Sequence, residues 1–415
     1  MVVEQMDTKI PGSKSILQRL QLLLAYARKG IVIKNFNPCD DALEMERALE
    51  TFGFIVEKIE PRVYRFDPSC HAQSTHNYEF AESATAFRLW LGFLASSTNI
   101  NSKIRLSENL IRRGFAPLVD ALRSLGAEIY TQDRNILIHG KTLSGTRASA
   151  EGETSSQYLS SLIFATLNMK SAPILQLPST QVSLPYIRLS LDLLKHFGVG
   201  HTQNHTQIRL EKCELKLPDS FEIDSDLSTA AFFIALGAIS QKGLSFPLKN
   251  NPLLPQPDGV IIDLIREMGG DISIIDSTCR IKHKPLNGFD FSIQDNPDLM
   301  PVLSILALFC TSPSSIRDVS RLKHKESNRL LGITRAFDEI GARYSLVENS
   351  LHVHPLQNSP KPAVLDTQGD HRLAMAFLLL KSRFEQISPS ETQSLSKSCP
   401  SCLARFLEIS ALMQN

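Results

Sequence analysis

The sequence predicts an α/β protein with two similar domains, each built from three units of one kind. Three observations favour this fold class. The chain has 415 residues, more than one hydrophobic core usually organises. One phrase of helix, glycine and strand recurs at regular spacing. A polar stretch near residue 222 separates three of these units from three others.

The recurring phrase is an amphipathic helix that ends in an apolar residue and a glycine and then runs into a strand. Glycine suits that position because the residue just past a helix often adopts the left-handed conformation. A sixth helix, CLARFLEISALMQN, runs out where its glycine would fall. The alternative is a set of unrelated units that happen to end alike. The five glycines, separated by 73, 72, 71 and 72 residues, are Gly53, Gly126, Gly198, Gly269 and Gly341.

The domain boundary is predicted where KCELKLPDSFEI leads into an apolar helix that opens at Ser228. We expect an N-terminal domain of residues 11–222 and a C-terminal domain of residues 1–10 plus 223–415. Pockets commonly form where domains meet, so we expect the active site in the cleft between the two halves.

The composition is that of a packed globular protein. Hydrophobic residues make up 42% and charged residues 21%, which argues against a disordered chain or a membrane protein. The net charge of +1 offers no field that would gather nucleic acid or anionic lipid. The opening segment MVVEQMDTKIPGSKS lacks the features of a signal peptide, and we expect a cytoplasmic protein.

The seven cysteines are scattered, apart from Cys399 and Cys402 in a C-x-x-C. There is no second pair or histidine cluster of the kind that binds zinc. We therefore expect reduced, structural thiols and no metal site.

Charged and polar residues recur at the predicted starts of apolar helices. In IPGSKSILQR, a helix N-terminus with free N–H groups is combined with Lys14, Ser15 and Arg19, which together make an anion site. Taken alone, such a basic residue is more typical of a solvated surface. RLKHKESNR (321–329) and GDHR (369–372) repeat the pattern, however. Several fixed cations brought together would suit a substrate with phosphates and carboxylates.

These phrases, in this order, resemble the 5-enolpyruvylshikimate-3-phosphate synthase family. The resemblance implies two similar domains of three βαβαββ units each, with helices buried around a pseudo-threefold axis, an inside-out α/β barrel. It implies transfer of the enolpyruvyl group of phosphoenolpyruvate to the 5-hydroxyl of shikimate 3-phosphate, on the way to chorismate and aromatic amino acids. The matching stretches are PGSKSILQR, ESATAFR with Arg88, LVDALRSLGAEI, EGETSSQYLSSL, VSLPYI, DSDLSTAAFF, DNPDLMPVLSILA, RLKHKESNR, GDHRLAMA and SLSKSCP.

The resemblance also implies the residues that bind each substrate. Serine hydroxyls and a lysine ammonium can donate to a phosphate, and an aspartate can accept from a ring hydroxyl. The positions for shikimate 3-phosphate are Lys14, Ser15, Arg19, Ser155, Ser156, Gln157, Ser183, Asp298 and Lys325. The positions for phosphoenolpyruvate are Lys14, Gln157, Arg329, Arg372 and Lys397.

Three residues are implicated by the resemblance in proton transfer: Lys14, Asp298 and Glu326. The hydroxyl adds to C2 of phosphoenolpyruvate while C3 gains a proton, and phosphate then leaves. We assign Glu326 to C3 and Asp298 or Lys14 to the hydroxyl. The cations around Glu326 favour its ionised form, so a proton donor there requires an opposing influence. The resemblance implies no metal and no organic cofactor, and a monomer that binds only its two small substrates.

Three positions depart from the family pattern. Ala84 replaces a glycine, and because alanine there goes with poor glyphosate binding in the family, we predict reduced glyphosate sensitivity. Asn109 stands where an arginine usually contacts phosphoenolpyruvate, a loss of roughly 1.5 to 3 kcal/mol. Arg112 or Arg105 would have to substitute for it. Gly114 replaces a customary proline.

Two other functions stay open from the sequence alone. A related enolpyruvyl transferase acts on a UDP-amino sugar, but its loop usually carries a reactive cysteine, which the stretch from Leu106 to Arg113 lacks. A catalytically impaired paralogue would bind shikimate 3-phosphate after losing efficient donor binding through Ala84 and Asn109. The retained cations and proton-transfer groups argue against that paralogue.

Overall fold

The computed structural model describes residues 9–69 and 75–414, and the chain folds into two compact units. The N-terminal unit comprises Gly12–Ile223 and Pro252–Leu254, and the C-terminal unit comprises Met1–Pro11, Asp224–Asn251 and Pro255–Asn415. Each unit has its own hydrophobic core. Within the described residues, no helix has both the length and the apolar character needed to cross a membrane.

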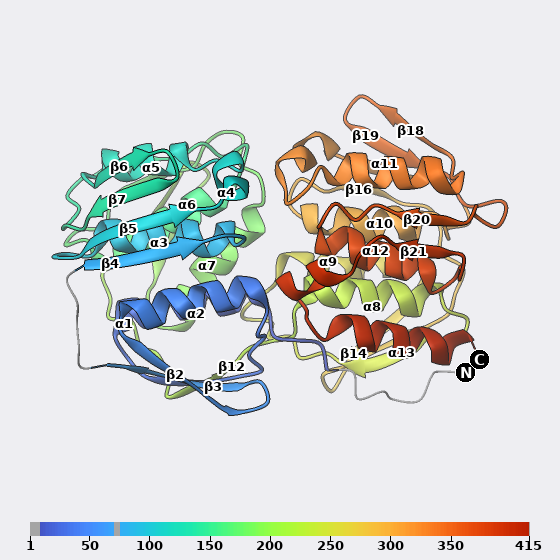
Figure 1. The fold of residues 1–415 in the computed structure, drawn as a ribbon, viewed down its shortest axis with the longest axis horizontal. Helices are drawn as coiled ribbons and strands as arrows, with labels where there is room; N and C mark the ends of the chain where they lie inside the picture. The colour runs from blue at the N-terminus through green and yellow to red at the C-terminus, as the bar shows by residue number, and fades with distance from the viewer. Residues whose placement is uncertain (1–8, 70–74, 415) are drawn as a thin grey trace. The chain divides into compact units, whose positions relative to one another are not determined.

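The N-terminal unit contains, in the part of the chain described, three four-stranded sheets with orders β12-β1-β3-β2, β4-β5-β7-β6 and β10-β11-β9-β8. The strands are β1 (Ile31–Lys34), β2 (Phe54–Glu60), β3 (Val63–Pro68), β4 (Thr75–Phe80), β5 (Asn101–Leu106), β6 (Glu128–Gln132), β7 (Asn135–His139), β8 (Arg147–Ser149), β9 (Ile174–Gln176), β10 (His201–Gln203), β11 (Gln207–Leu210) and β12 (Ser220–Glu222). The helices are α1 (Lys14–Ala27), α2 (Asp40–Phe52), α3 (Ala84–Ser96), α4 (Glu108–Arg112), α5 (Ala116–Ser124), α6 (Gln157–Ala165) and α7 (Leu184–His196), with the 3-10 helix η1 (Thr166–Asn168) (Figure 1).

The C-terminal unit has sheets of order β13-β15-β14, β16-β17-β19-β18 and β20-β21 among the residues described. The strands are β13 (Leu244–Pro247), β14 (Asp271–Ile275), β15 (Thr278–Lys282), β16 (Asp290–Ser292), β17 (Ser314–Arg317), β18 (Tyr344–Val347), β19 (Ser350–Val353), β20 (Ala363–Leu365) and β21 (Ile387–Pro389). The helices are α8 (Leu227–Ile239), α9 (Val260–Glu267), α10 (Met300–Ala307), α11 (Arg329–Ile340), α12 (His371–Lys381) and α13 (Cys402–Gln414), with 3-10 helices η2 (Pro257–Gly259), η3 (Pro297–Leu299), η4 (Val319–His324) and η5 (Gln393–Lys397).

The order βαβαββ occurs in both units. In the N-terminal unit β4 is parallel to β5, and β7 lies antiparallel between β5 and β6. In the C-terminal unit β16, β17, β19 and β18 repeat this pairing. Strand β12 comes from the end of the N-terminal unit and completes the first sheet. It pairs in parallel with β1, with Val32 opposite Ser220. The predicted α/β fold class is confirmed.

All five glycines of the recurring phrase follow a helix and have a positive φ, between 75° and 103°. Strands β2, β6, β10, β14 and β18 come shortly after them. A side chain at these positions would strain the backbone, which explains why the phrase ends in glycine. The sixth helix of the series is α13, as expected.

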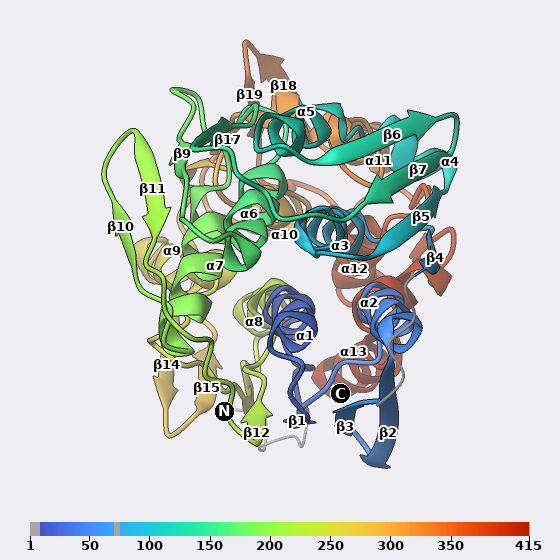
Figure 2. The ribbon, with the colours of Figure 1, turned by 90° about the vertical axis from the view of Figure 1, so that its left-hand side faces the viewer.

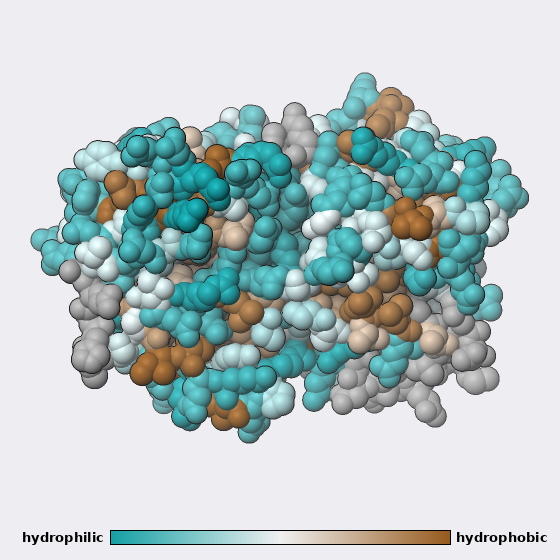
Figure 3. All heavy atoms as spheres, viewed as in Figure 1, coloured by the Kyte–Doolittle hydropathy of each residue, from teal (hydrophilic) through white to brown (hydrophobic). Residues whose placement is uncertain are grey.

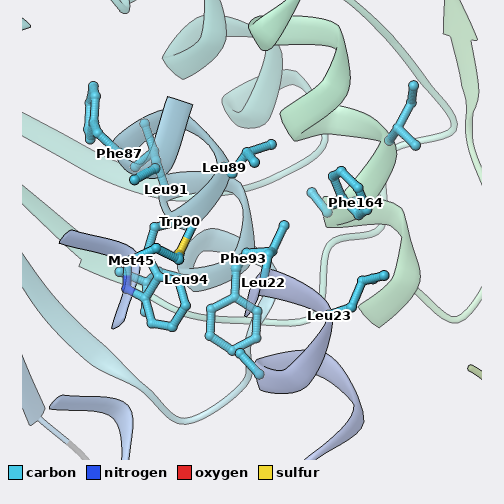
Figure 4. Packing of buried hydrophobic residues seen from close by; sticks show 14 of the residues in the cluster. Leu22, Leu23, Met45, Phe87, Leu89, Trp90, Leu91, Phe93, Leu94 and Phe164 are labelled. Atoms are coloured by element: carbon cyan, nitrogen blue, oxygen red, sulfur yellow. The ribbon is translucent and has the colours of Figure 1, made fainter. Parts of the chain in front are cut away.

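Helices form the interior of the N-terminal unit. Helices α1, α2, α3, α6 and α7 contact one another through several pairs, and Figure 2 shows the sheets lying outside them. Every residue of α3 except Thr85 is buried, as is typical of a helix that is apolar all round. Trp90 and Phe93 of α3 pack at 5.0 Å between ring centres, near Met45 and Leu22 (Figure 4). Hydrophilic side chains cover most of the face seen in Figure 3.

One expectation about the cysteines is wrong. Cys399 and Cys402 are joined in a disulfide, with their Cα atoms 5.3 Å apart. The short turn between η5 and α13 brings the two Cα atoms into the range that a disulfide spans. Among the other cysteines in the described residues, Cys39, Cys279 and Cys310 are buried and Cys213 is exposed.

Candidate functional site

Helix α1 begins at Lys14, as the predicted anion site requires. The Nζ atom of Lys14 lies 2.8 Å from Oδ2 of Asp41 on α2, and its side chain is 15% exposed. Ser15 follows in a half-buried position. The ammonium group is therefore anchored by a carboxylate but still accessible to a ligand.

Arg19 lies one turn further along α1 and is buried. Its Nε donates to Ser190 Oγ at 2.9 Å, its Nη1 to the Ser15 carbonyl at 2.9 Å, and its Nη2 to the Tyr186 carbonyl at 3.2 Å. Burial lowers the pKa of Arg19 to about 10, which leaves it charged at neutral pH. Because these three acceptors are neutral, they hold the guanidinium in place without cancelling its charge.

Arg88 of α3 joins several predicted binding groups. Its Nη1 donates to Gln157 Oε1 at 2.7 Å and to Ser155 Oγ at 3.2 Å. Its Nη2 donates to the carbonyls of Arg113 and Gly114, at 2.9 and 2.6 Å. From the sequence, Arg88 belongs to the matching stretch ESATAFR but not to the predicted site residues. Its position one turn after a helix start, like that of Arg19, was the signal that could have identified it.

The amide of Gln157 is held from both ends. Its Oε1 accepts from Arg88, and its Nε2 donates to Thr85 Oγ1 at 2.8 Å. Gln157 is the first residue of α6, and Ser156 before it is buried. The orientation of the side chain is therefore set before any ligand binds.

Ser183 precedes α7 with φ 55° and ψ 40°, in the left-handed region that few residues other than glycine adopt. It is 4% exposed. Such backbone strain persists where the surrounding structure enforces it, often at functional sites. Helix α7 also carries Ser190, which donates to Ser160 of α6 at 3.2 Å, so α1, α6 and α7 are linked around Arg19.

The atypical loop places a cation beside Asn109. Arg112 Nη2 donates to Asn109 Oδ1 at 3.0 Å, and Asn109 Nδ2 donates to Glu82 Oε2 at 3.4 Å. Arg105 instead lies 3.9 Å from Glu79 in an exposed pair between β5 and β4. Of the two expected substitutes, Arg112 is therefore the one that lies next to Asn109.

Ala84 is the first residue of α3 and is 3% exposed. It packs within the hydrophobic core of the N-terminal unit. The reduced glyphosate sensitivity expected from this alanine remains a prediction.

In the C-terminal unit, Arg329 binds three carboxylates. Its Nη1 donates to Asp298 Oδ1 at 2.7 Å, its Nη2 to Glu326 Oε2 at 2.9 Å, and its Nε to Asp370 Oδ2 at 2.9 Å. Arg329 is fully buried, which disfavours its charge, but Asp370, Asp298 and Glu326 hold its pKa well above the usual value. We call Asp298, Glu326, Arg329 and Asp370, together with Lys325 and Arg372, the Arg329 cluster.

Asp298 is shared by three cations. Besides Arg329, Lys325 Nζ lies 3.6 Å from Oδ1 and Arg372 Nη2 lies 3.7 Å from Oδ2. Burial of Asp298 favours the neutral acid, but Lys325, Arg329 and Arg372 outweigh it and hold the pKa of the carboxyl well below its usual range. Burial lowers the pKa of Lys325 to about 8. Asp298 is thus an ionised acceptor beside a lysine that gives up its proton more readily than usual.

Two carboxylates of this region, Asp370 and Asp258, are not among the predicted site residues. Asp370 caps α12 by accepting from the Arg372 N–H at 2.8 Å, besides binding Arg329. Asp258 is buried, and that burial together with the charge of Asp298 raises its pKa to about 6. Asp370 lies within the stretch GDHR, whose position at a helix start indicated a binding site. Nothing in the sequence around Asp258 indicates that it lies near the site.

Lys397 is the last residue of η5 and is 5% exposed. Helix η5 packs against α12, which carries Arg372. The structure thus brings together most of the predicted residues in two groups. One group lies on α1, α6 and α7 of the N-terminal unit and the other lies around Arg329 in the C-terminal unit.

Solved structures identify the class of fold. An EPSP synthase from Acinetobacter baumannii matches with a TM-score of 0.81 and 21% identity, covering 99% of this chain and 95% of that one. The enolpyruvyl transferase NikO from Streptomyces tendae matches with a TM-score of 0.71 and 14% identity, covering 98% and 94%. The fold is therefore that of the enolpyruvyl transferases.

The family follows from the sequence comparisons. The model of the EPSP synthase (3-phosphoshikimate 1-carboxyvinyltransferase) family matches residues 5–403, so the chain belongs to that family. The 3-phosphoshikimate 1-carboxyvinyltransferase of Haemophilus influenzae strain PittEE is 27% identical over 96% of this chain and 95% of its own length. That of Dehalococcoides mccartyi strain 195 is 27% identical over 95% and 93%.

Proposed function

We propose that this enzyme transfers the enolpyruvyl group of phosphoenolpyruvate to the 5-hydroxyl of shikimate 3-phosphate and releases phosphate. Its membership of the EPSP synthase family supports this reaction. The structural feature that best supports this reaction is the Asp298 carboxylate. It is held ionised beside Lys325, Arg329 and Arg372. Such a carboxylate accepts hydrogen bonds and so suits a hydroxyl that must be oriented next to an anionic donor.

Shikimate 3-phosphate would use the groups linked around Arg19 and Arg88. Ser155, Ser156 and Ser183 offer hydroxyl donors for its phosphate. Arg19 supplies a positive charge that its neutral partners leave uncancelled. The Lys325 ammonium would also donate to the phosphate, and Asp298 would accept from a ring hydroxyl, which places the nucleophile beside an acceptor.

Phosphoenolpyruvate would use Lys14, Gln157, Arg329, Arg372 and Lys397, with Asn109 and Arg112 at the atypical position. Four N–H···O contacts from Arg329 go to protein carboxylates. An arginine has five N–H donors, so a substrate carboxylate must take the remaining one or displace a partner. Glu326 is the partner we expect to be displaced: Asp370 is fully buried, and Asp298, although 24% exposed, is also held by Lys325 and Arg372, whereas Glu326 is 16% exposed.

Displacement of Glu326 would prepare it for proton transfer. A carboxyl group that loses its cationic partner and gains a neighbouring anion binds a proton more readily. Binding of the donor would therefore convert Glu326 into the acid that protonates C3. The tetrahedral intermediate would then lose phosphate while the nearby cations stabilise the leaving group.

The experiment is phosphate release from the purified protein with phosphoenolpyruvate and shikimate 3-phosphate, with UDP-N-acetylglucosamine as a parallel acceptor. Release with shikimate 3-phosphate alone supports the proposal. Release with the UDP sugar contradicts it. Release with neither, from a folded sample that still binds shikimate 3-phosphate, contradicts the proposed activity and favours an impaired paralogue.

We also propose that the enzyme acts in the cytoplasm as a monomer, without metal or organic cofactor, as the family resemblance implies. Phosphate release that is unchanged after treatment with EDTA, from a species that sediments as a monomer, is the expected outcome. Activity that needs an added metal ion, or that resides in a dimer, contradicts this part of the proposal.

A further inference from the structure

A disulfide lies close in sequence to one of the proposed phosphoenolpyruvate ligands. Cys399 and Cys402 bridge the turn between η5, which ends at Lys397, and α13, which begins at Cys402. The two cysteines are only 2% and 1% exposed and belong to the hydrophobic core of the C-terminal unit. The bridge therefore fixes the chain two residues after Lys397.

The backbone couples the bridge to Lys397. The Leu395 carbonyl accepts from the N–H of Ser398 at 3.2 Å and from that of Cys399 at 2.8 Å. The Cys402 N–H donates to the Cys399 carbonyl at 3.1 Å. Turn hydrogen bonds thus run from η5 through the bridge into α13, so that a shift of Cys399 moves the segment that carries Lys397.

Reduction would force such a shift. Two thiols cannot lie as close together as two bonded sulfur atoms, and a packed interior accommodates added volume only by moving its parts. Helix α13 is anchored by Phe406, whose ring lies 5.8 Å from that of Phe233, and by the fully buried Ile409. The short connection 398–401 is therefore the part that gives way.

We propose that Cys399 and Cys402 form a reversible thiol–disulfide site that controls the affinity for phosphoenolpyruvate through Lys397. This inference rests on the proposed function of Lys397. An external dithiol supplies two electrons and two protons, the bond between the sulfur atoms breaks, two protein thiols form, and the dithiol leaves as its own disulfide. Disulfides in reducing compartments such as the proposed cytoplasm are usually transient and serve catalysis or redox sensing.

The test compares the oxidised full-length protein with the protein reduced by dithiothreitol. Reduction is expected to expose two more titratable thiols in denaturant. It is expected to raise KM for phosphoenolpyruvate roughly tenfold, the effect of weakening one charge-assisted contact. KM for shikimate 3-phosphate is expected to stay the same, because Lys397 is not among its proposed ligands. Unchanged KM for phosphoenolpyruvate after both thiols appear overturns the proposal.

Two variants separate this site from other cysteines. The double variant Cys399→Ser, Cys402→Ser is expected to show the higher KM with and without dithiothreitol. The exposed Cys213 supplies the matched control, because Cys213→Ser should respond to dithiothreitol as the natural protein does. A double variant that still responds to dithiothreitol refutes the assignment.

Amide hydrogen exchange distinguishes failure of this inference from failure of the proposed function. If neither redox state releases phosphate, the proposed function fails, and exchange across residues 393–402 then decides the redox site. Faster exchange in the reduced protein supports the site. Equal exchange in both states overturns it.

Discussion

The two groups of proposed site residues hold their arginines in different ways. In the N-terminal unit, Arg19 and Arg88 donate to hydroxyls, an amide oxygen and backbone carbonyls, none of which carries a charge. In the C-terminal unit, Arg329 donates to three carboxylates. The first arrangement keeps positive charge for a ligand, whereas the second balances charge until a ligand exchanges with one carboxylate. We propose that the first arrangement serves anion binding alone, and that the second lets Glu326 exchange with a substrate carboxylate and then transfer a proton.

Removal of Arg329 is expected to have the largest effect. Arg329→Met removes the arginine that Asp370 contacts and one of the three cations around Asp298, and loss of one partner of a buried ion pair typically costs about 3–5 kcal/mol. Urea denaturation measures the change in the free energy of unfolding. Arg317, which pairs with Asp290 at 2.6 Å on the exposed surface, is the control. Arg317→Met should cost less than about 1 kcal/mol. Equal losses of unfolding free energy in the two variants would contradict the expectation that the buried pairs of Arg329 matter more than the exposed pair of Arg317.

Glu326→Gln tests whether the Arg329 cluster moves protons. The glutamine amide can still accept from Arg329, so stability should change little. The rate constant kcat should fall roughly 10²- to 10⁴-fold, as is typical when a general acid is lost. Exchange of solvent deuterium into C3 of phosphoenolpyruvate should fall in parallel. Glu339→Gln, at an exposed position near the end of α11, should leave both unchanged. Normal deuterium exchange in Glu326→Gln would exclude Glu326 as the acid.

Arg88→Lys tests whether positioning in the N-terminal unit depends on the shape of the guanidinium. Lysine keeps the charge but cannot serve Ser155, Gln157 and two carbonyls at once. We expect kcat/KM to fall roughly tenfold to a hundredfold, the effect of losing charge-assisted hydrogen bonds. Arg105→Lys, in an exposed pair, should behave like the natural enzyme. A fully active Arg88→Lys would show that charge alone suffices.

Asn109→Arg restores the cation that the family usually has near the donor. If Arg112 does not already replace it, KM for phosphoenolpyruvate should fall roughly tenfold. Asn109→Ala removes the contacts to Glu82 and Arg112 and serves as the control. An unchanged KM in Asn109→Arg, with a large increase in Arg112→Ala, would assign the role to Arg112.

Asp258 gives an expected effect on stability that depends on pH. Its pKa is raised from 3.8 to about 6, so the folded protein binds more protons than the unfolded chain between those values. The contribution of Asp258 to stability therefore falls as pH rises from about 4 to about 6, by on the order of 2 kcal/mol. Asp258→Asn should remove this loss in urea denaturation at several pH values. Parallel curves for the two proteins would contradict the assignment.

The sequence predicted the fold class and the repeat because both depend on local rules. A residue that ends a helix in the left-handed conformation is best served by glycine, and all five predicted glycines have positive φ. Lys14 and Arg372 likewise lie at the starts of helices, where the sequence placed them. Arg329 begins α11, but Lys325 and Glu326 lie in the connection before it, after η4.

The sequence did not predict which side chains these residues contact. Arg329 is separated by 31 residues from Asp298 and by 41 from Asp370, and Arg88 by 69 from Gln157. Many carboxylates and amides along the chain could serve such an arginine equally well by chemistry alone. The choice among them is made only when the helices pack.

The sequence by itself thus determined the helix ends, the repeated units and the family of this protein. Only the tertiary structure decided that Arg88 holds Gln157, that Asp298 is shared by three cations, and that Cys399 bonds Cys402. Backbone conformation at a helix end depends on neighbours a few residues away. Charge pairing and burial depend on which distant segments meet, because desolvation and Coulomb energy are set by the surrounding packing.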